Sequence, residues 1–298
     1  MPRHTIKSSK IVPMKKLLFS LTITALGIAP LSAQVADSTG LPGDNFDLQG
    51  VLELFKNSES LEAFEKALNS ESNEVNNLDV DEDGQVDYVK VIDHTDSGSH
   101  AITLQVDVND KESQDIAVIE IDKTGDETAE LQIVGDEEMY GKDYIIEPEE
   151  ETANSQDGKF TSGFAPPVVI VNVWGWRPIR HIYSPTYVVW VSPWRYRVYP
   201  PYFKPWRPVA WRVHHARVVR YHHHCRVVHV HRVARAHRIA HHHRVASNHY
   251  HQRNAGRRAN PGGRQGNPGG KQQGGGKQHG GGGQRGAGKQ HGGGGRHR

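Results

Sequence analysis

Nearly half of this chain contains no acidic side chain. Residues 158–298 have neither Asp nor Glu, whereas all 34 acidic residues lie between Asp37 and Asp157. The stretch 34–157 in turn has no arginine and only six lysines. With His taken as neutral, these two parts carry charges of −28 and +25, although the formal net charge is only +2. Such a division indicates physically different regions, one of them an interaction tail.

Cysteine is almost absent too, and recognisable catalytic motifs are missing. The single cysteine, Cys225, excludes an internal disulfide, so other forces must hold the fold. No phosphate-binding glycine loop or dinucleotide fingerprint is present. Asp93, His94, Ser97 and His100 lie within one short stretch, DHTDSGSH, but catalytic triads are usually built from residues distant in sequence. We therefore expect a protein that is not an enzyme, with an enzyme of unknown type as the last of the alternatives.

No apolar run is long enough to span a bilayer comfortably. The longest, Leu17 to Ala29, follows Met14 and two lysines, which is the pattern of a secretory signal peptide. We predict a signal peptide over 1–33, with the true start at Met14 and the first 13 residues an over-extended start. The alternative is an uncleaved membrane anchor. The mature chain is expected to be exported without a transmembrane span, to the periplasm, the outer-envelope surface or the medium.

Hydrophobic periodicity predicts an acidic α+β domain over residues 44–147. Helical spacing appears twice, the second time after Ser58 or Ser60 as a cap. The residues that carry it are Leu48, Val51, Leu52, Phe55, Leu61, Phe64 and Leu68. The period then changes to two in VDYVKVID, in 102–108, in DIAVIEID and in TAELQIVG, and DYIIEP is a further candidate strand. Short turns between these strands predict an antiparallel meander of four to five strands, covered by two short helices.

The rest of the chain divides by composition into four regions. Residues 148–165 form a polar linker, and 166–212 are rich in Trp, Tyr, Pro and Arg, with all six tryptophans of the protein. In that region VVIVNVW and TYVVWVS are expected to be strands and the remainder extended. Residues 213–251 are rich in His and Arg. The Gly-rich basic tail, 252–298, cannot bury apolar surface and is expected to be disordered.

The acidic stretch 79–90, DVDEDGQVDYVK, has the ligand spacing of a calcium loop. The expected ligands are the carboxylates of Asp79, Asp81, Asp83 and Asp87 and the main-chain carbonyl of Gln85. Gly84 permits the sharp turn, but Lys90 stands where an EF-hand has its twelfth-position glutamate. A strand pattern follows instead of a second helix, which favours a structural calcium loop at the entry to a strand. The alternative is a solvated acidic turn.

The D-x-D-x-D-G-x-x-D spacing resembles the calcium loops of FG-GAP and VCBS-type repeats, although this chain has one copy and the propeller fold of those families does not carry over. The acidic domain, with NFDLQGVLELFK and QDIAVIEIDKTGDETAELQIVGDEEMYG, resembles a group of uncharacterised exported proteins of Gram-negative bacteria. The likeness extends into VVIVNVWGW and VWVSPWRYR. It implies the domain layout and export, and nothing about mechanism.

The His/Arg segment favours metal binding without a fixed ligand set. Imidazoles bind zinc, nickel and copper, and Cys225 adds a soft ligand. The candidate ligands are His222, His223, His224, Cys225, His229, His231, His237 and His241. His229 and His231 would share one face of a strand, and His237 and His241 one face of a helix. Because interleaved arginines repel cations, we expect multi-site, adventitious binding, with dedicated metal buffering as an alternative function.

The same composition favours a surface for anionic polymers, which is the function we expect first. Arginines can pair with phosphates and sulfates, and aromatic rings can stack on sugars or bases. The candidate residues are Arg177, Trp194, Arg195, Arg197, Trp206, Arg207 and Arg212. For an exported protein, anionic glycans and lipid headgroups rank above nucleic acid as partners. A third possibility is internal, in which the basic tail pairs with the acidic domain of its own or a neighbouring chain.

Overall fold

The computed structural model describes residues 38–142, 144–150 and 169–258. The predicted signal peptide, most of the predicted linker and residues 259–298 of the predicted tail lie outside these ranges. Within the described ranges, no helix combines the length and the apolar character needed to cross a membrane.

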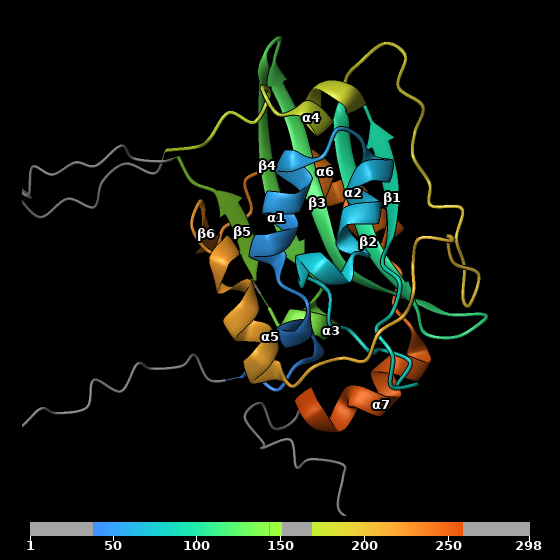
Figure 1. Cartoon of the computed structure of the whole chain (residues 1–298). Coiled ribbons are helices and arrows are strands. Elements are labelled where there is room, and N and C mark those ends of the chain that lie inside the picture. The colour runs from blue at the N-terminus through green and yellow to red at the C-terminus, as the bar shows by residue number, and fades with distance from the viewer. Residues whose placement is uncertain (1–37, 143, 151–168, 259–298) are drawn as a thin grey trace, which may run out of the picture. The chain divides into compact units, whose positions relative to one another are not determined.

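The described chain is α+β, as predicted, with one antiparallel sheet and several short helices (Figure 1). The strands are β1 (Lys90–Asp96), β2 (Ser99–Asp107), β3 (Ser113–Gly125), β4 (Thr128–Gly135), β5 (Ile145–Pro148) and β6 (Cys225–Val228). The helices are α1 (Leu48–Asn57), α2 (Leu61–Leu68), α3 (Glu137–Tyr140), α4 (Arg177–Ile182), α5 (Trp211–Val218), α6 (Ala234–His243) and α7 (Asn248–Arg258). Short 3-10 turns are η1 (Pro42–Asn45), η2 (Glu71–Asn73) and η3 (Val219–Tyr221).

The six strands pair in the order β1-β2-β3-β4-β5-β6, so the predicted count of four to five is at least one strand short. The missing strand, β6, comes from the His/Arg segment and pairs antiparallel with β5, where Ile145 is opposite Val228. Periodicity could not reveal it, because β6 has only four residues and its pairing partner lies about 80 positions earlier in the chain. The acidic and basic parts of the sequence therefore share one sheet.

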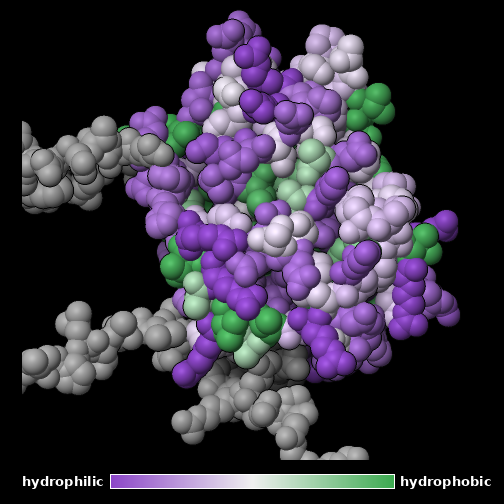
Figure 2. Space-filling view, in the orientation of Figure 1, coloured by the Kyte–Doolittle hydropathy of each residue, from purple (hydrophilic) through white to green (hydrophobic). Residues whose placement is uncertain are grey.

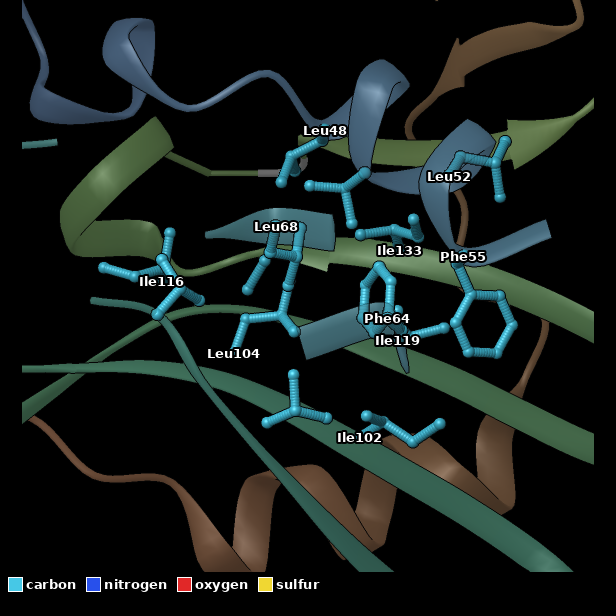
Figure 3. Packing of buried hydrophobic residues seen from close by; sticks show 14 of the residues in the cluster. Leu48, Leu52, Phe55, Phe64, Leu68, Ile102, Leu104, Ile116, Ile119 and Ile133 are labelled. Atoms are coloured by element: carbon cyan, nitrogen blue, oxygen red, sulfur yellow. The ribbon is translucent and has the colours of Figure 1, made fainter. Parts of the chain in front are cut away.

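One face of the sheet packs against α1 and α2, which form where the periodicity predicted them. Ser60 caps α2 by accepting a hydrogen bond from the amide of Ala63 at 3.1 Å, which satisfies one of the free N–H groups of the first turn. Phe55 and Phe64 meet edge to face, with ring centroids 5.3 Å apart. Figure 3 shows their side chains and the helix leucines pointing at strand residues such as Ile119. This layer is the apolar core.

The opposite face of the sheet is polar yet buried, which the sequence did not predict. Its side chains, all exposed by 6 % or less, are Thr103, Gln105, Asp115, Glu120, Asp122, Gln132 and Glu147. Helix α6 covers this face and contacts β1, β2 and β3 on the side away from α1 and α2 (Figures 1 and 3). The structure thus has three layers, and the second helical layer is made by the basic half of the chain.

Helix α6 begins at a carboxylate of the sheet. Asp122 on β3 accepts hydrogen bonds from the amides of Arg235 and Ala236, both at 3.0 Å. These amides belong to the first turn of α6, where N–H groups have no partner within the helix and the helix dipole favours a negative charge. Asp122, more than a hundred positions earlier in the chain, thus caps the N-terminus of α6.

Other polar side chains of this face bind the backbone of the covering segment. Gln132 Oε1 accepts from the amide of Arg232 at 2.8 Å, and Gln132 Nε2 donates to the carbonyl of Val230 at 2.8 Å. Asp115 accepts from the amide of Val245 at 2.7 Å. These bonds fix the path of an irregular chain whose backbone groups would otherwise be buried without partners.

Buried acids of the sheet pair with arginines from the basic half. Glu147 on β5 lies 2.9 Å from Arg226 and 2.8 Å from Arg232. Burial raises the pKa of Glu147, but hydrogen bonds from the two arginines outweigh that effect and hold the pKa below its usual value. Asp136, just after β4, accepts from Arg244 at 2.7 Å. The basic and acidic parts of the sequence are therefore ionic partners within one chain.

The aromatic region, described from Val169 onward, is largely irregular, as expected, but its two predicted strands are wrong. VVIVNVW and TYVVWVS form no strand of the sheet in the described residues, and Val191 makes only an isolated bridge to Ile92. Buried side-chain bonds hold this region instead. The carboxylate of Glu65, 1 % exposed, accepts from Trp190 Nε1 at 3.0 Å and from Ser192 Oγ at 2.8 Å.

Regular structure extends further into the basic half than predicted. The region 213–251 contributes most of α5, all of β6 and α6, and part of α7. Helix α7 continues through Gln252 to Arg258, where disorder was expected. The start of α7 is held by Glu112, which accepts from Ser247 Oγ and, at 3.0 Å, from the amide of His249. A helix that takes its partners from the acidic domain cannot be found from the composition of the tail alone.

Replacing Gln132 by leucine should destabilise the protein by about 2–4 kcal/mol, because Leu has similar volume but leaves the amide of Arg232 and the carbonyl of Val230 buried without partners. Equilibrium unfolding in urea measures the change. The matched control is Gln252→Leu, an exposed position on α7, which should stay within about 0.5 kcal/mol of wild type. Equal effects of the two substitutions would contradict the assigned role of Gln132.

Candidate functional site

The acidic loop brings three of its four aspartates together. Ligand oxygens of Asp79, Asp81 and Asp87 all lie within 4.8 Å of one another, a spacing that suits one cation. Gly84 has a φ of +83°, the left-handed conformation that glycine adopts without strain, and its amide donates to Asp79 Oδ2 at 3.1 Å. The loop therefore has the sharp turn and converging carboxylates that the sequence predicted.

Asp83 and Gln85, the other two predicted ligands, bind each other. The carboxylate of Asp83 accepts from the amide of Gln85 at 2.9 Å and from its Nε2 at 3.3 Å. Lys90, which stands in place of the glutamate of an EF-hand, begins β1 and pairs with Asp107 on β2. The twelfth position is thus part of the sheet, as the strand pattern of the sequence indicated.

The clustered carboxylates lack full compensation by hydrogen bonds. Asp79 Oδ1 is buried with no hydrogen-bond partner among the described residues. Burial raises the pKa of Asp79, and the negative charges of Asp81 and Asp83 add to that rise. Burial likewise raises the pKa of Asp87 well above its usual value, with Asp81 and Asp79 adding to it. A divalent cation would offset both the cost of burying these carboxylates and the repulsion between them.

The basic half of the chain closes over this loop. Tyr196 donates its hydroxyl to Asp81 Oδ2 at 3.1 Å, and the amide of Val86 donates to the carbonyl of Trp206 at 2.7 Å. Arg253 on α7 donates to the carbonyls of Val80 and Asp81. No local sequence signal links Tyr196 and Arg253 to the loop, because the contacts span more than a hundred residues.

A second cluster lies on the polar face of the sheet, in a cavity of about 290 Å³ between β3, β4 and α6. Glu120 on β3, His231 in the segment before α6 and His237 on α6 place ligand atoms within 4.8 Å of one another. Glu120 Oε1 lies 2.8 Å from His237 Nδ1, and the rings of His231 and His237 are 4.2 Å apart between centroids. The hydrogen bond that His237 donates to Glu120 raises the pKa of His237.

None of the other six predicted metal ligands belongs to this cluster in the described part of the chain, although His241 lines the same cavity. His222 bonds to Asp47 at 2.9 Å, and burial raises the pKa of the Cys225 thiol to about 11, which disfavours the thiolate that metals bind. His229 and His231 do not share a strand face as predicted, because β6 ends at Val228. His237 and His241 do lie on one helix, α6, and both line the cavity. Glu120 was missed by the sequence reasoning, since its acidic neighbours give it no distinctive pattern.

The predicted anion-binding residues lie mostly on one exposed segment. Arg195, Arg197, Arg207 and Arg212 are exposed, and Trp194 and Trp206 are half-buried. Arg177 lies apart from them at the start of α4 and pairs with Glu59 at 3.2 Å, where both side chains are largely exposed. Figure 2 shows that the surface facing the viewer is mostly hydrophilic, with small separate hydrophobic patches.

The short acidic turn DHTDSGSH forms a buried pair without a triad. His100 Nδ1 lies 2.9 Å from Asp93 Oδ2, and Tyr187 donates to the same oxygen at 2.7 Å. Ser97 Oγ donates to Asp96 at 2.8 Å. These contacts attach the aromatic region to β1 and β2.

Comparisons with protein-family models, with curated proteins and with solved structures give no match for this chain. Its function is therefore inferred from the geometry of its own residues.

Calcium should raise the melting temperature of the full chain, because it binds the folded loop better than the unfolded chain. At ten to a hundred times its Kd, which we expect in the range of extracellular calcium modules, calcium should add about 1–3 kcal/mol. Differential scanning calorimetry with calcium and with magnesium measures the effect, which should be much smaller with magnesium.

Two variants test whether calcium binds to the three converging carboxylates and not to Asp83. Asp81→Asn should remove most of the calcium-dependent rise, since Asp81 belongs to the cluster, whereas Asp83→Asn should retain most of it. If both variants keep the full rise, the loop does not bind calcium through these carboxylates.

Proposed function

We propose that this protein is a non-catalytic, exported, envelope-associated interaction protein that binds anionic polymers or surfaces, with calcium bracing the binding segment. The observation that carries this proposal is the unequal neutralisation of the basic half. Export rests on the signal peptide expected from the sequence.

Most arginines of the region 217–244 form ion pairs with acidic side chains of the same chain. Arg226, Arg232 and Arg244 pair with buried acids of the sheet, and Arg217 and Arg220 pair with Glu74 at 3.2 and 2.7 Å. These five arginines share three carboxylates, so more than half of their charge is compensated within the chain. This internal pairing reduces the part of the basic half that can act as an interaction surface.

The segment 195–212, here called the basic aromatic segment, retains its charge. Its five basic side chains are exposed, and within the described part of the chain none has an acidic partner. They are Arg195, Arg197, Lys204, Arg207 and Arg212. Guanidinium groups donate in pairs to phosphate, sulfate and carboxylate oxygens, so unneutralised arginines on one segment favour an anionic polymer as the partner.

The aromatic rings of this segment mainly anchor it. Phe203 is 5 % exposed and packs edge to face on Tyr88, with centroids 5.0 Å apart. Trp206 in turn packs on Phe203, with ring centroids 5.8 Å apart. The rings thus hold the arginines on the acidic domain, and recognition by ionic contacts favours anionic glycans and lipid headgroups over base stacking with nucleic acid.

The candidate calcium loop lies directly under the basic aromatic segment. Tyr196 bonds to the loop carboxylate of Asp81, and the carbonyl of Trp206 accepts from the loop amide of Val86. An ordered loop would therefore keep two points of the segment in place. We infer that calcium lowers the conformational freedom that the segment loses on binding, and so strengthens binding.

Binding to heparin should weaken steeply as the salt concentration rises, because each ionic contact releases condensed counterions. The triple variant Arg195→Gln, Arg207→Gln, Arg212→Gln should lose a large part of this binding. With duplex DNA as a second probe, the slope of log K against log salt should be less steep for the triple variant than for wild type by about two to three units. Titration calorimetry or fluorescence at several salt concentrations gives the slopes.

The control for this experiment is a triple variant with the same change of net charge, Lys111→Gln, Lys142→Gln, Arg238→Gln. These residues are exposed and lie outside the basic aromatic segment. The control should keep most of the affinity. If the two triple variants weaken binding equally, only net charge matters and the proposed surface is wrong.

A further inference from the structure

We propose that Glu120, His231 and His237 form a binding site for one divalent transition-metal ion, of which zinc is the type case. The site goes beyond the polymer-binding function, because it lies on the polar face of the sheet, away from the basic aromatic segment. It also differs from the multi-site binding expected from the histidine pattern.

The three residues come from three separate parts of the fold and converge on one cavity. Glu120 is held by β3, His237 by the first turns of α6, and His231 by a segment whose backbone Gln132 fixes on either side. The ligand atoms lie within 4.8 Å of one another before any ion is bound. Two imidazole nitrogens and one carboxylate oxygen suit zinc, nickel, cobalt and copper better than calcium or magnesium.

An unsatisfied oxygen gives independent evidence for a ligand. Glu120 is 1 % exposed, and its Oε2 atom is buried with no hydrogen-bond partner among the described residues. A carboxylate oxygen in that state is costly, and such exceptions are rare in folded proteins. Burial also raises the pKa of Glu120, against the effect of the bond from His237. A metal ion beside Oε2 would satisfy this oxygen.

The close contact between Glu120 and His237 marks where the ion would lie. Glu120 Oε1 and His237 Nδ1 are 2.8 Å apart and share a hydrogen bond. An ion bound by both groups would replace the proton of this bond, because the ligands of a metal are the neutral imidazole and the ionised carboxylate. Glu120 would thus bind the ion directly.

The charges around the cavity favour a cation. Its acidic lining residues are Asp115, Glu120, Asp136 and Glu137, against the single arginine Arg244. Arg244 is held by Asp136 at 2.7 Å, so its charge is compensated before it faces the cavity. Three protein ligands leave one position of a tetrahedral ion open, and the cavity of about 290 Å³ has room there for water or a small anion.

Cobalt(II) titration of the full chain, followed by visible absorption, tests the site. One equivalent should give the intense bands of a four- or five-coordinate ion, and zinc should displace it. His237→Ala and Glu120→Gln should each weaken this signal at least about tenfold in apparent affinity. The matched control is His242→Ala, a neighbouring exposed histidine on the same helix that lies outside this cavity.

The outcomes separate an ordered site from scattered histidine binding. If His242→Ala weakens the signal as much as His237→Ala, or if neither changes it, the site does not exist. His231→Ala separates metal binding from folding, because His231 is exposed: its urea midpoint should change much less than its cobalt signal, which should be lost. Retention of the full signal by this variant would overturn the proposed ligand set.

Addition of azide to the cobalt-loaded protein should shift the absorption bands, because azide can bind the open coordination position. An unchanged spectrum would contradict the open position.

Discussion

The structure depends on the neutralisation of a buried, acidic sheet face by the basic half of the same chain. A carboxylate moved out of water destabilises the fold unless it gains a cation or hydrogen-bond donors. Glu147 gains two arginines, Asp136 gains one, and Asp122 gains the first turn of a helix. The sheet alone would expose these acids on a flat surface, and the basic segment alone would have no acids to pair with. Each half therefore supplies what the other lacks.

This constraint also decides which groups remain for function. Arginines that neutralise the sheet have acidic partners within the chain, whereas the five basic side chains of the segment 195–212 are exposed and have none in the described ranges. Acids that find no full partner are equally informative. Asp79 and Glu120 each keep a buried oxygen without a hydrogen-bond partner in the described ranges, and each lies in a cluster spaced for a cation. The two proposed metal sites are thus places where internal neutralisation is incomplete.

Much of the acidic part could be predicted from sequence, because its structure is set by local patterns. The periods of α2 and β4 and the turn residues between strands gave their positions, and the Asp-Gly spacing indicated the loop at Asp79. The basic half could not be predicted in the same way. Helix α6 depends on Asp122, and β6 depends on β5, so their stability comes from contacts about 80 or more residues apart. The available signals were the spacing of His237 and His241, which suited a helix, and the opposite charge of the two halves, which made internal pairing an alternative.

The central claim is that both halves form one cooperative unit, and the chain has built-in probes for it. All six tryptophans lie between Trp174 and Trp211, whereas five of the six strands lie between Lys90 and Pro148. Tryptophan fluorescence therefore reports the basic half, and the far-ultraviolet circular dichroism of the sheet reports mainly the acidic half. In urea, both signals should follow one coincident transition. A fluorescence transition completed at lower urea, with the sheet signal intact, would contradict the account.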